Sequence, residues 1–220
     1  MSMQIGVDIV IFTVQDSALK ILLTRRGKPP FKGRMAIPGR SIGAHETLER
    51  AALRELKEET GARSVYLEQL YSFDDPRRDP RGRMVTVAYY ALVPGNGSAA
   101  TPGNGSGAEW RRADRLPPLA FDHRHIVDYA LERLRNKLEY TTVGFQLLPR
   151  KFTLPELQTV YETILGKKLD KRNFRKKMDL LGILKPLREY RRTGRKPARL
   201  YSFIPRKFEK LKDKGILFPF

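Results

Sequence analysis

The 220-residue sequence contains no cysteine, and no apolar run in it approaches the roughly 18 residues that a membrane-spanning helix needs. Without cysteine the chain can form neither disulfides nor thiolate metal sites, which agrees with a reducing cytoplasm. The N-terminus also lacks the charged region, long apolar stretch and cleavage site of a signal peptide. We therefore expect a cytoplasmic, soluble globular protein with no membrane partner.

Acidic residues are few relative to basic ones, and the imbalance is concentrated near the C-terminus. The chain has 43 Lys and Arg against 24 Asp and Glu, a formal net charge of +19. From Thr141 to Phe220 there are 21 basic and 7 acidic residues, whereas the first 140 residues have 22 and 17. A concentrated positive face attracts polyanions and releases condensed counterions on binding. Nucleic acid is therefore the leading partner, with a solubilising surface or an anionic membrane or ribosome surface as alternatives.

The first 140 residues combine strand and helix patterns. Apolar, β-branched runs on either side of a turn at Gln15-Asp16-Ser17 predict a hairpin. A helical composition follows, and Gly61 suits its C-terminal cap. The Gly/Ser-rich segment from Pro94 to Ala108 is expected to be a flexible loop. The other predicted elements are strands at 5–14, 19–24, 65–73 and 83–93 and helices at 46–60 and 122–140.

The remaining 80 residues have the order of a winged helix. Thr153 and Glu156 form a possible capping box for a helix that ends before Gly166. Asp170 can cap a second, basic helix from Lys171 to Leu181. Two short strands, LKPLREY and RLYSFIP, then flank the basic turn RRTGRKPA. We predict two domains, 1–140 and 141–220.

Three glutamates of the first helix fall on one side. Glu55, Glu58 and Glu59 lie within an arc of roughly 100° by the helical period. Mg²⁺ prefers oxygen ligands and commonly joins carboxylates to substrate phosphates, although an acidic stripe can also be a solvated face. The three histidines, His45, His123 and His125, form no metal-ligand pattern with one another and are expected at surface or capping positions.

The complete spacing resembles the Nudix box, G-x5-E-x7-R-E-U-x-E-E-x-G-U, in which U is aliphatic. The matching residues are Glu46, Arg54, Glu55, Leu56, Glu58, Glu59, Gly61 and, loosely, Ala62. Arg40 stands at the position of the opening glycine, beside Gly39, where glycine lets the backbone turn tightly or approach a ligand. The resemblance implies Glu55, Glu58 and Glu59 as Mg²⁺ ligands. If the chain hydrolyses a nucleoside diphosphate, it implies Glu58 and Glu109 as catalytic groups.

The segment RDPRGR, 78–83, is similar to a feature of Nudix branches that act on ADP-ribose or related sugars. Guanidinium groups bind phosphates bidentately, and a carboxylate accepts hydrogen bonds from ribose hydroxyls. An ordinary charged hairpin loop is the alternative. The predicted effector-binding residues are Arg40, Arg78, Asp79, Arg81 and Arg83.

A winged helix places its second helix in the major groove and its wing over neighbouring phosphates. The residues predicted to contact base edges or nearby phosphates are Arg172, Asn173, Arg175 and Lys176. Those predicted to contact phosphates alone are Lys177, Arg191, Arg192, Arg195, Lys196 and Arg199. A basic domain with a purely structural role is the alternative.

The whole arrangement resembles the NrtR family of Nudix-related transcriptional regulators, from the first strand to about Pro205. The resemblance rests on the Nudix box, RDPRGR, FDHRHIVDYALERLR, and LDKRNFRKK followed by GRKPARLYSF. It implies an α+β protein: an N-terminal Nudix α/β/α sandwich with a mixed sheet, followed by a C-terminal winged helix-turn-helix domain.

The resemblance also implies a function. Such regulators are homodimers that bind double-stranded operator DNA of NAD-biosynthesis genes, and ADP-ribose or a related nucleotide releases that DNA. The altered glycine fits a box that has drifted from catalysis toward sensing. A Mg²⁺-dependent ADP-ribose pyrophosphatase whose C-terminal domain serves dimerisation or localisation is the main alternative. An RNA-associated Nudix enzyme is a third, and regulation and hydrolysis can also coexist.

Overall fold

The structure, a computed structural model, describes residues 3–62, 65–95, 107–192 and 196–212. The chain forms two compact units, Met1–Arg133 and Leu134–Phe220, here called the N-terminal and C-terminal units. The boundary between them falls inside helix α2, His123–Leu138. The sequence-based division after residue 140 stays a prediction. Among the described residues, no helix is both long enough and apolar enough to cross a membrane.

A mixed β-sheet forms the centre of the N-terminal unit. Its strands are β1 (Gln4–Gln15), β2 (Ala18–Arg25), β3 (Met35–Ala36), β4 (Gly39–Ser41), β5 (Tyr66–Phe73), β6 (Met84–Leu92) and β7 (Glu109–Arg112). The main order is β3-β2-β1-β6-β5, with β4 paired to β1 and β7 paired to β2. Strand β1 runs parallel to β6 and antiparallel to β2. The predicted hairpin is confirmed, and Asp16 and Ser17 both have the positive φ that tight hairpin turns favour.

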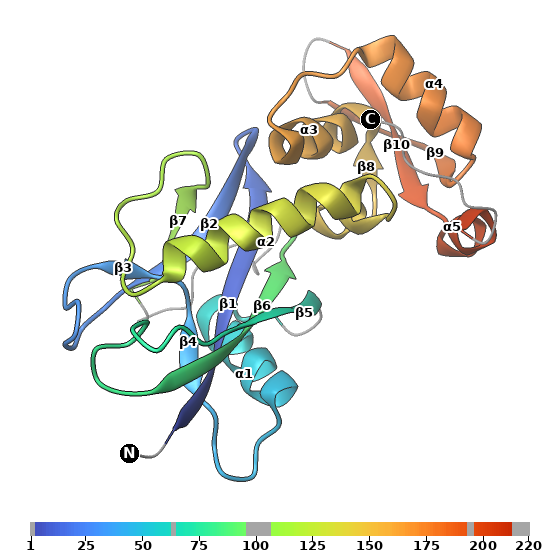
Figure 1. The fold of residues 1–220 in the computed structure, drawn as a ribbon. Helices are drawn as coiled ribbons and strands as arrows, with labels where there is room; N and C mark the ends of the chain where they lie inside the picture. Colours follow the sequence, from blue (N-terminus) through green and yellow to red (C-terminus); the bar gives the residue numbers. More distant parts are fainter. Residues whose placement is uncertain (1–2, 63–64, 96–106, 193–195, 213–220) are drawn as a thin grey trace. The chain divides into compact units, whose positions relative to one another are not determined.

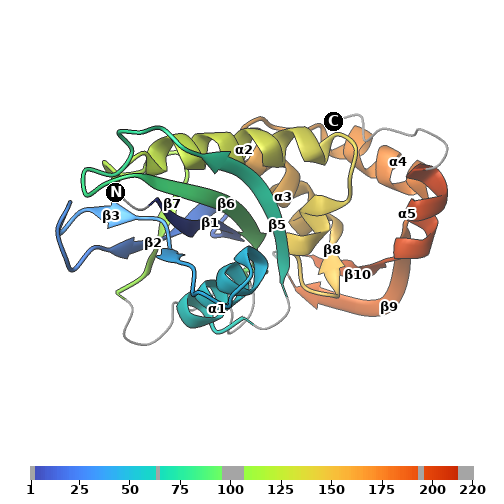
Figure 2. The same ribbon diagram turned by 60° about the horizontal axis from the view of Figure 1, so that its bottom comes forward.

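Helices cover the two faces of this sheet (Figures 1 and 2). Helix α1, Leu48–Thr60, packs against the face of β1 that carries Val7, Ile9 and Ile11. Helix α2 covers the opposite face with a buried side that includes Ile126, Val127 and Ala130. Because side chains alternate along a strand, Asp8 is on the α2 side of the sheet. The predicted α/β/α sandwich with a mixed sheet is confirmed.

The ends of α1 are fixed by local chemistry. The Thr47 side chain accepts a hydrogen bond from the Arg50 backbone N–H at the start of the helix. Gly61 ends the helix in the left-handed region, with φ of 68°, as the sequence predicts. These caps determine where the box glutamates are placed, because they set the first and last turns of the helix.

The C-terminal unit is a winged helix, as predicted. It contains a 3-10 helix η2 (Val143–Leu147), helices α3 (Leu154–Leu165), α4 (Lys171–Leu181) and α5 (Pro205–Lys212), and strands β8 (Phe152–Thr153), β9 (Leu184–Arg192) and β10 (Pro197–Phe203). The strands form a sheet of order β8-β10-β9. Thr153 and Glu156 make the full capping box, and the Asp170 side chain caps α4. Strand β8 and helix α5 were not predicted.

Candidate functional sites

A cleft of about 310 Å³ opens in the N-terminal unit beside the first half of β1, β4 and the loop before β6. It brings together four of the residues predicted to bind an effector, Arg40, Arg78, Asp79 and Arg81. Arg83 and Glu109 are not among its lining residues. Among the lining residues that the sequence did not single out for this site are Asp8, Arg26, Ile37, Phe121 and His123.

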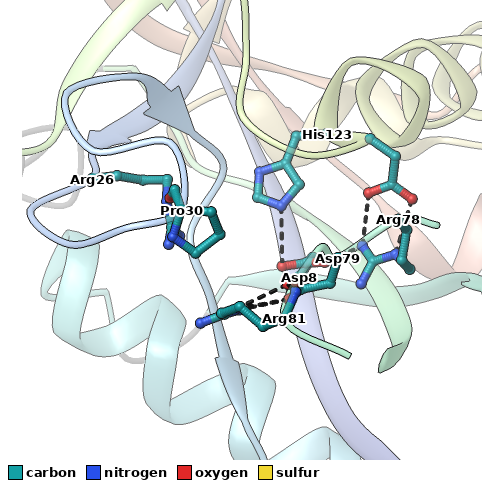
Figure 3. A network of polar contacts seen from close by, with 8 residues as sticks. Asp8, Arg26, Pro30, Arg78, Asp79, Arg81 and His123 are labelled. Carbon is teal, nitrogen blue, oxygen red and sulfur yellow. Dashed lines mark hydrogen bonds and ion pairs between the residues drawn. The ribbon is translucent and has the colours of Figure 1, made fainter. Parts of the chain in front are cut away.

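Arg78 lies at the centre of a buried ion-pair network beside the cleft (Figure 3). Its side chain is only 5% exposed. Nε and Nη2 donate to the two carboxylate oxygens of Asp122 at 2.9 and 2.8 Å, and Nη2 also donates to Asp8 at 3.1 Å. Burial acts to lower the pKa of Arg78, but the hydrogen bonds to Asp122 and the charge of Asp8 outweigh it and raise the pKa. Arg78 is therefore a charged residue whose guanidinium is largely committed to protein carboxylates.

His123 extends this network from the first turn of α2. Its Nδ1 accepts a hydrogen bond from the Ile37 backbone N–H at 3.1 Å, and its Nε2 lies 3.8 Å from Asp8. Burial lowers the pKa of His123, so the ring is neutral at neutral pH and its proton is assigned to Nε2, which faces Asp8. The expectation of a surface or capping role was wrong for this histidine, because it is 5% exposed and lines the cleft.

Asp79 and Arg81 form a bidentate pair within the predicted RDPRGR segment. Asp79 accepts hydrogen bonds from the Arg81 backbone N–H at 2.9 Å and from Nη2 at 2.6 Å. The hydrogen bonds from the Arg81 side chain are the main reason that the pKa of Asp79 is lowered. The Arg81 side chain is 54% exposed, so part of its guanidinium remains open to the cleft.

An aromatic ring is placed among these cations. The guanidinium carbons of Arg26 and Arg81 lie 4.5 and 5.6 Å from the Phe121 ring centroid. Phe31 packs edge-to-face on the same ring at 5.0 Å. Phe31 and Phe121 both have positive φ, 63° and 51°, a backbone region that bulky residues rarely adopt and that is enriched at binding sites. Guanidinium groups beside an aromatic face suit an anionic ligand that carries phosphates.

Arg40 contacts two of the box glutamates directly. Its Nε lies 3.1 Å from Glu55 and its Nη2 lies 2.8 Å from Glu58. Burial raises the pKa of Glu55, while the charge of Arg40 acts in the opposite direction. The box arginine, Arg54, is engaged elsewhere.

Arg54 pairs with the first glutamate of the box. Two hydrogen bonds of 2.8 Å join its guanidinium to the Glu46 carboxylate. These bonds are the main reason that the pKa of Glu46 is lowered to about 2. Arg54 also lies 3.8 Å from Glu58, four residues further along the helix. Glu46 thus anchors the loop before α1 to the helix. The sequence spacing did not identify Glu46 as the partner of Arg54.

The predicted Mg²⁺ site was Glu55, Glu58 and Glu59. Within the described ranges, no group of three or more His, Asp or Glu side chains is arranged so that it could hold a metal ion. Two of the three carboxylates already face the Arg40 guanidinium. A fixed cation at this distance opposes the approach of a second one. As they are arranged, these residues do not fit Mg²⁺.

Helix α4 exposes most of the predicted DNA-binding residues. Arg172, Asn173, Arg175 and Lys176 are exposed, whereas Phe174 and Met178 are buried. Lys177 is half-buried. The helix therefore presents a basic face to solvent while its apolar stripe anchors it in the unit.

The predicted wing residues are not equivalent. Arg192, Lys196 and Arg199 are exposed, although the Arg199 Nε donates to the Leu187 carbonyl at 2.7 Å. Arg191 donates to Glu156 at 2.7 Å and to the Lys151 carbonyl at 3.0 Å, so its guanidinium binds the wing to the start of α3. Arg195 lies outside the described residues.

Two family models match the chain: the NUDIX domain over residues 3–130 and the NrtR DNA-binding winged helix domain over residues 144–203. A relative from Acinetobacter baylyi, described as an ADPR responsive transcriptional repressor, is 38% identical over 217 residues, which cover 97% of this chain and 84% of the relative.

Two solved structures of an NrtR protein are also similar to this chain. NrtR of Shewanella oneidensis complexed with a 27mer DNA is 37% identical, with a TM-score of 0.81 over 93% of this chain and 95% of that one. The NUDIX domain of the same protein complexed with ADP ribose is 38% identical, with a TM-score of 0.53 over 61% of this chain and 90% of that one.

Proposed function

The chain belongs to the NrtR family, and from this premise we propose that it is a DNA-binding transcriptional repressor that responds to ADP-ribose or a related nucleotide. The nucleotide binds in the cleft of the N-terminal unit and lowers the affinity of the C-terminal unit for operator DNA. One observation carries the proposal: a single chain combines an arginine-lined cleft with an exposed basic helix in a winged-helix unit. We further propose that it acts as a homodimer in the cytoplasm on operators of NAD-biosynthesis genes.

The contacts in the cleft support different roles for the residues predicted to bind the effector. Arg81 and Arg26, which both lie beside the Phe121 ring, are proposed to bind the diphosphate of the nucleotide. Asp79 remains the candidate for ribose hydroxyls, because a carboxylate has further acceptor sites after pairing with Arg81. Arg78 positions the cleft wall through its aspartate partners instead of binding phosphate. Arg83 lies outside the cleft lining and donates to the Asp74 carbonyl.

The residues predicted to bind DNA also divide into those proposed to contact DNA and one proposed to position the wing. Arg172, Asn173, Arg175 and Lys176 are placed on the exposed side of α4, as insertion into the major groove requires. Exposed Arg192 and Lys196 are suited to phosphates. Lys177, Arg195 and Arg199 remain predicted phosphate contacts. Arg191 holds the wing through Glu156 and is assigned a positioning role.

An effector can relieve repression only if it binds the state that cannot bind DNA more tightly than it binds the state that can. The cleft has a direct connection to α2, because Arg78 and Asp8 in its lining contact Asp122 and His123 at the start of that helix. The last five residues of the same helix belong to the C-terminal unit. A ligand that changes the contacts of Arg78 or Asp8 therefore changes the support of the first turn of α2.

The test is fluorescence anisotropy with a labelled promoter fragment from the gene neighbourhood of this chain, at fixed salt, with and without ADP-ribose. We expect tight, sequence-selective binding that ADP-ribose relieves. An unrelated duplex of the same length and base composition is the matched control. The Arg81→Ala variant is expected to bind the fragment normally and to need much more ADP-ribose for release. Weak, salt-sensitive binding to every duplex that ADP-ribose does not affect would overturn the proposal.

A Mg²⁺-dependent ADP-ribose pyrophosphatase remains the second candidate, because Glu55, Glu58 and Glu59 are all present. The contacts of Arg40 with two of these carboxylates weigh against it. A pyrophosphatase assay with Mg²⁺ on the same preparation distinguishes the two: a repressor without hydrolysis leaves ADP-ribose intact.

A further inference from the structure

Arg40 occupies the position at which the Nudix box has its opening glycine, and its side chain reaches two box glutamates. Strand β4 carries Arg40, and α1 carries Glu55 and Glu58. The guanidinium bridges the two carboxylates at 3.1 and 2.8 Å. A glycine at this position has no side chain and leaves the space in front of the glutamates open. The departure from the box therefore adds a cation at the carboxylates that the box uses for a metal.

The position of Glu55 explains why a cation is needed there. Its side chain is 5% exposed, and a buried carboxylate without a counter-charge is strongly unfavourable. Arg54, the neighbouring cation of the box, is held by two hydrogen bonds to Glu46. Within the described part of the chain, Arg40 is the cation in ion-pair contact with Glu55. It supplies the charge neutralisation that a metal ion would otherwise provide.

We propose that Arg40 replaces the divalent metal ion of the Nudix site. Its guanidinium pairs with Glu55 and Glu58, offsets one of their two negative charges and keeps divalent cations away from them. The Arg40 side chain is 47% exposed and lines the cleft, so part of its guanidinium remains open to a ligand there. The cleft consequently binds a phosphate-bearing ligand without a metal and leaves it uncleaved. Arg40 thereby accounts for sensing in place of hydrolysis by this box.

The test measures binding of Mn²⁺ alone to the full chain by electron paramagnetic resonance of the free ion. Arg40→Ala is expected to gain one Mn²⁺ site, with affinity at least about tenfold above that of the wild type, because a repelling unit charge has been removed from the carboxylates. The double variant Arg40→Ala/Glu55→Gln is expected to lose that site. Arg50→Ala is the matched control, because it removes the same charge from an exposed position on the first turn of α1.

Two further variants separate charge from folding. Arg40→Gln keeps a long polar side chain beside Glu55 but carries no charge, so it is expected to gain the Mn²⁺ site even if Arg40→Ala unfolds. Arg40→Lys keeps the positive charge and is expected to exclude Mn²⁺ like the wild type. Circular dichroism identifies which variants are folded.

Two results would overturn the proposal. One is a wild-type chain that binds Mn²⁺ as tightly as the folded neutral variants and loses it in Glu55→Gln, which would mean that the arginine gives way to the metal. The other is a folded neutral variant that gains no site. Since the probe is the metal alone, neither result depends on the identity of the effector or on DNA binding.

Discussion

Three arginines of the cleft and two exposed cations of α4 differ in their relation to nearby carboxylates. In the cleft, Arg40, Arg78 and Arg81 each contact at least one aspartate or glutamate. On α4, Arg172 and Lys176 are exposed and make no ion pair with any described residue. A paired guanidinium is held in one position and its charge is largely offset by the carboxylate. Paired arginines therefore give the cleft a fixed shape that can match a small ligand. Unpaired cations retain a field that extends into solvent, which suits a polyanion. The number of arginines therefore does not by itself define what a site binds.

The largest expected change is a loss of folding stability on removal of Arg78, the most strongly paired cation of the cleft. Arg78→Met leaves Asp8 and Asp122 without their shared partner in a buried setting, and we expect the free energy of unfolding to fall by about 3–5 kcal/mol. Urea denaturation followed by circular dichroism measures this loss. The adjacent Arg77 is 91% exposed, so Arg77→Ala should change stability by no more than about 0.5 kcal/mol. Equal effects of the two variants would show that burial of the network does not matter.

Removing exposed cations of α4 should affect DNA binding and leave the fold and effector binding intact, since Arg172 makes no ion pair with a described residue and Arg175 only a long one of 4.0 Å to exposed Asp179. For Arg172→Ala/Arg175→Ala we expect operator affinity to drop by about 100-fold, since each good arginine contact with a base contributes about 1–3 kcal/mol. Anisotropy at fixed salt measures DNA affinity, and calorimetry measures ADP-ribose affinity. The double variant Arg50→Ala/Arg77→Ala removes the same charge from exposed positions of the N-terminal unit and serves as the control. Normal operator binding by the α4 variant would refute the recognition-helix assignment.

The smallest expected effect is a pH dependence of stability caused by His123. Burial lowers its pKa. The charges of Asp8 and Asp122 act against this shift, and the charges of Arg78 and Arg26 add to it. Between its unfolded pKa of about 6.5 and its lower folded pKa, the unfolded chain binds a proton that the folded chain does not. Stability is therefore lost as the pH falls through this window, by about 1 kcal/mol between about pH 7.5 and pH 5.5.

His123→Asn isolates this contribution. The Asn side chain can still accept the Ile37 N–H but does not titrate, so its urea midpoint should change less over the same pH interval than that of the wild type. If the two pH dependences are equal, His123 is not the source of the effect.

The features that the sequence predicted are those encoded by neighbouring residues. The hairpin at Asp16-Ser17, the end of α1 at Gly61 and the capping box of Thr153 and Glu156 all depend on residues within a few positions of one another. The winged helix followed from such local patterns, because its helices and strands are consecutive. The Nudix box likewise lies in a single loop and helix.

The cleft was harder to predict because its contacts join distant segments. Arg78 is bonded to Asp122 and Asp8, which are 44 and 70 positions away. A motif that contains Arg78 shows its charge but not the partners that engage it, and for this reason the sequence suggested a phosphate ligand. One signal was present in β1, where Asp8 interrupts an apolar run. Phe121 and His123 gave no comparable signal, since their role depends on how the loop before α2 meets the cleft.

Two adjacent positions of the cleft differ in how far they can diverge during evolution. A Cβ atom at Gly39 would lie 2.1 Å from the Asp8 carboxylate, so every substitution there forces Asp8 to move. Position 40 has no such restriction, because its side chain extends from an exposed strand toward α1. A lineage can therefore replace residue 40 while the rest of the site persists, and the replacement can be reversed. If Arg40 has the proposed role, a single substitution at this position decides whether Glu55 and Glu58 are open to a metal ion.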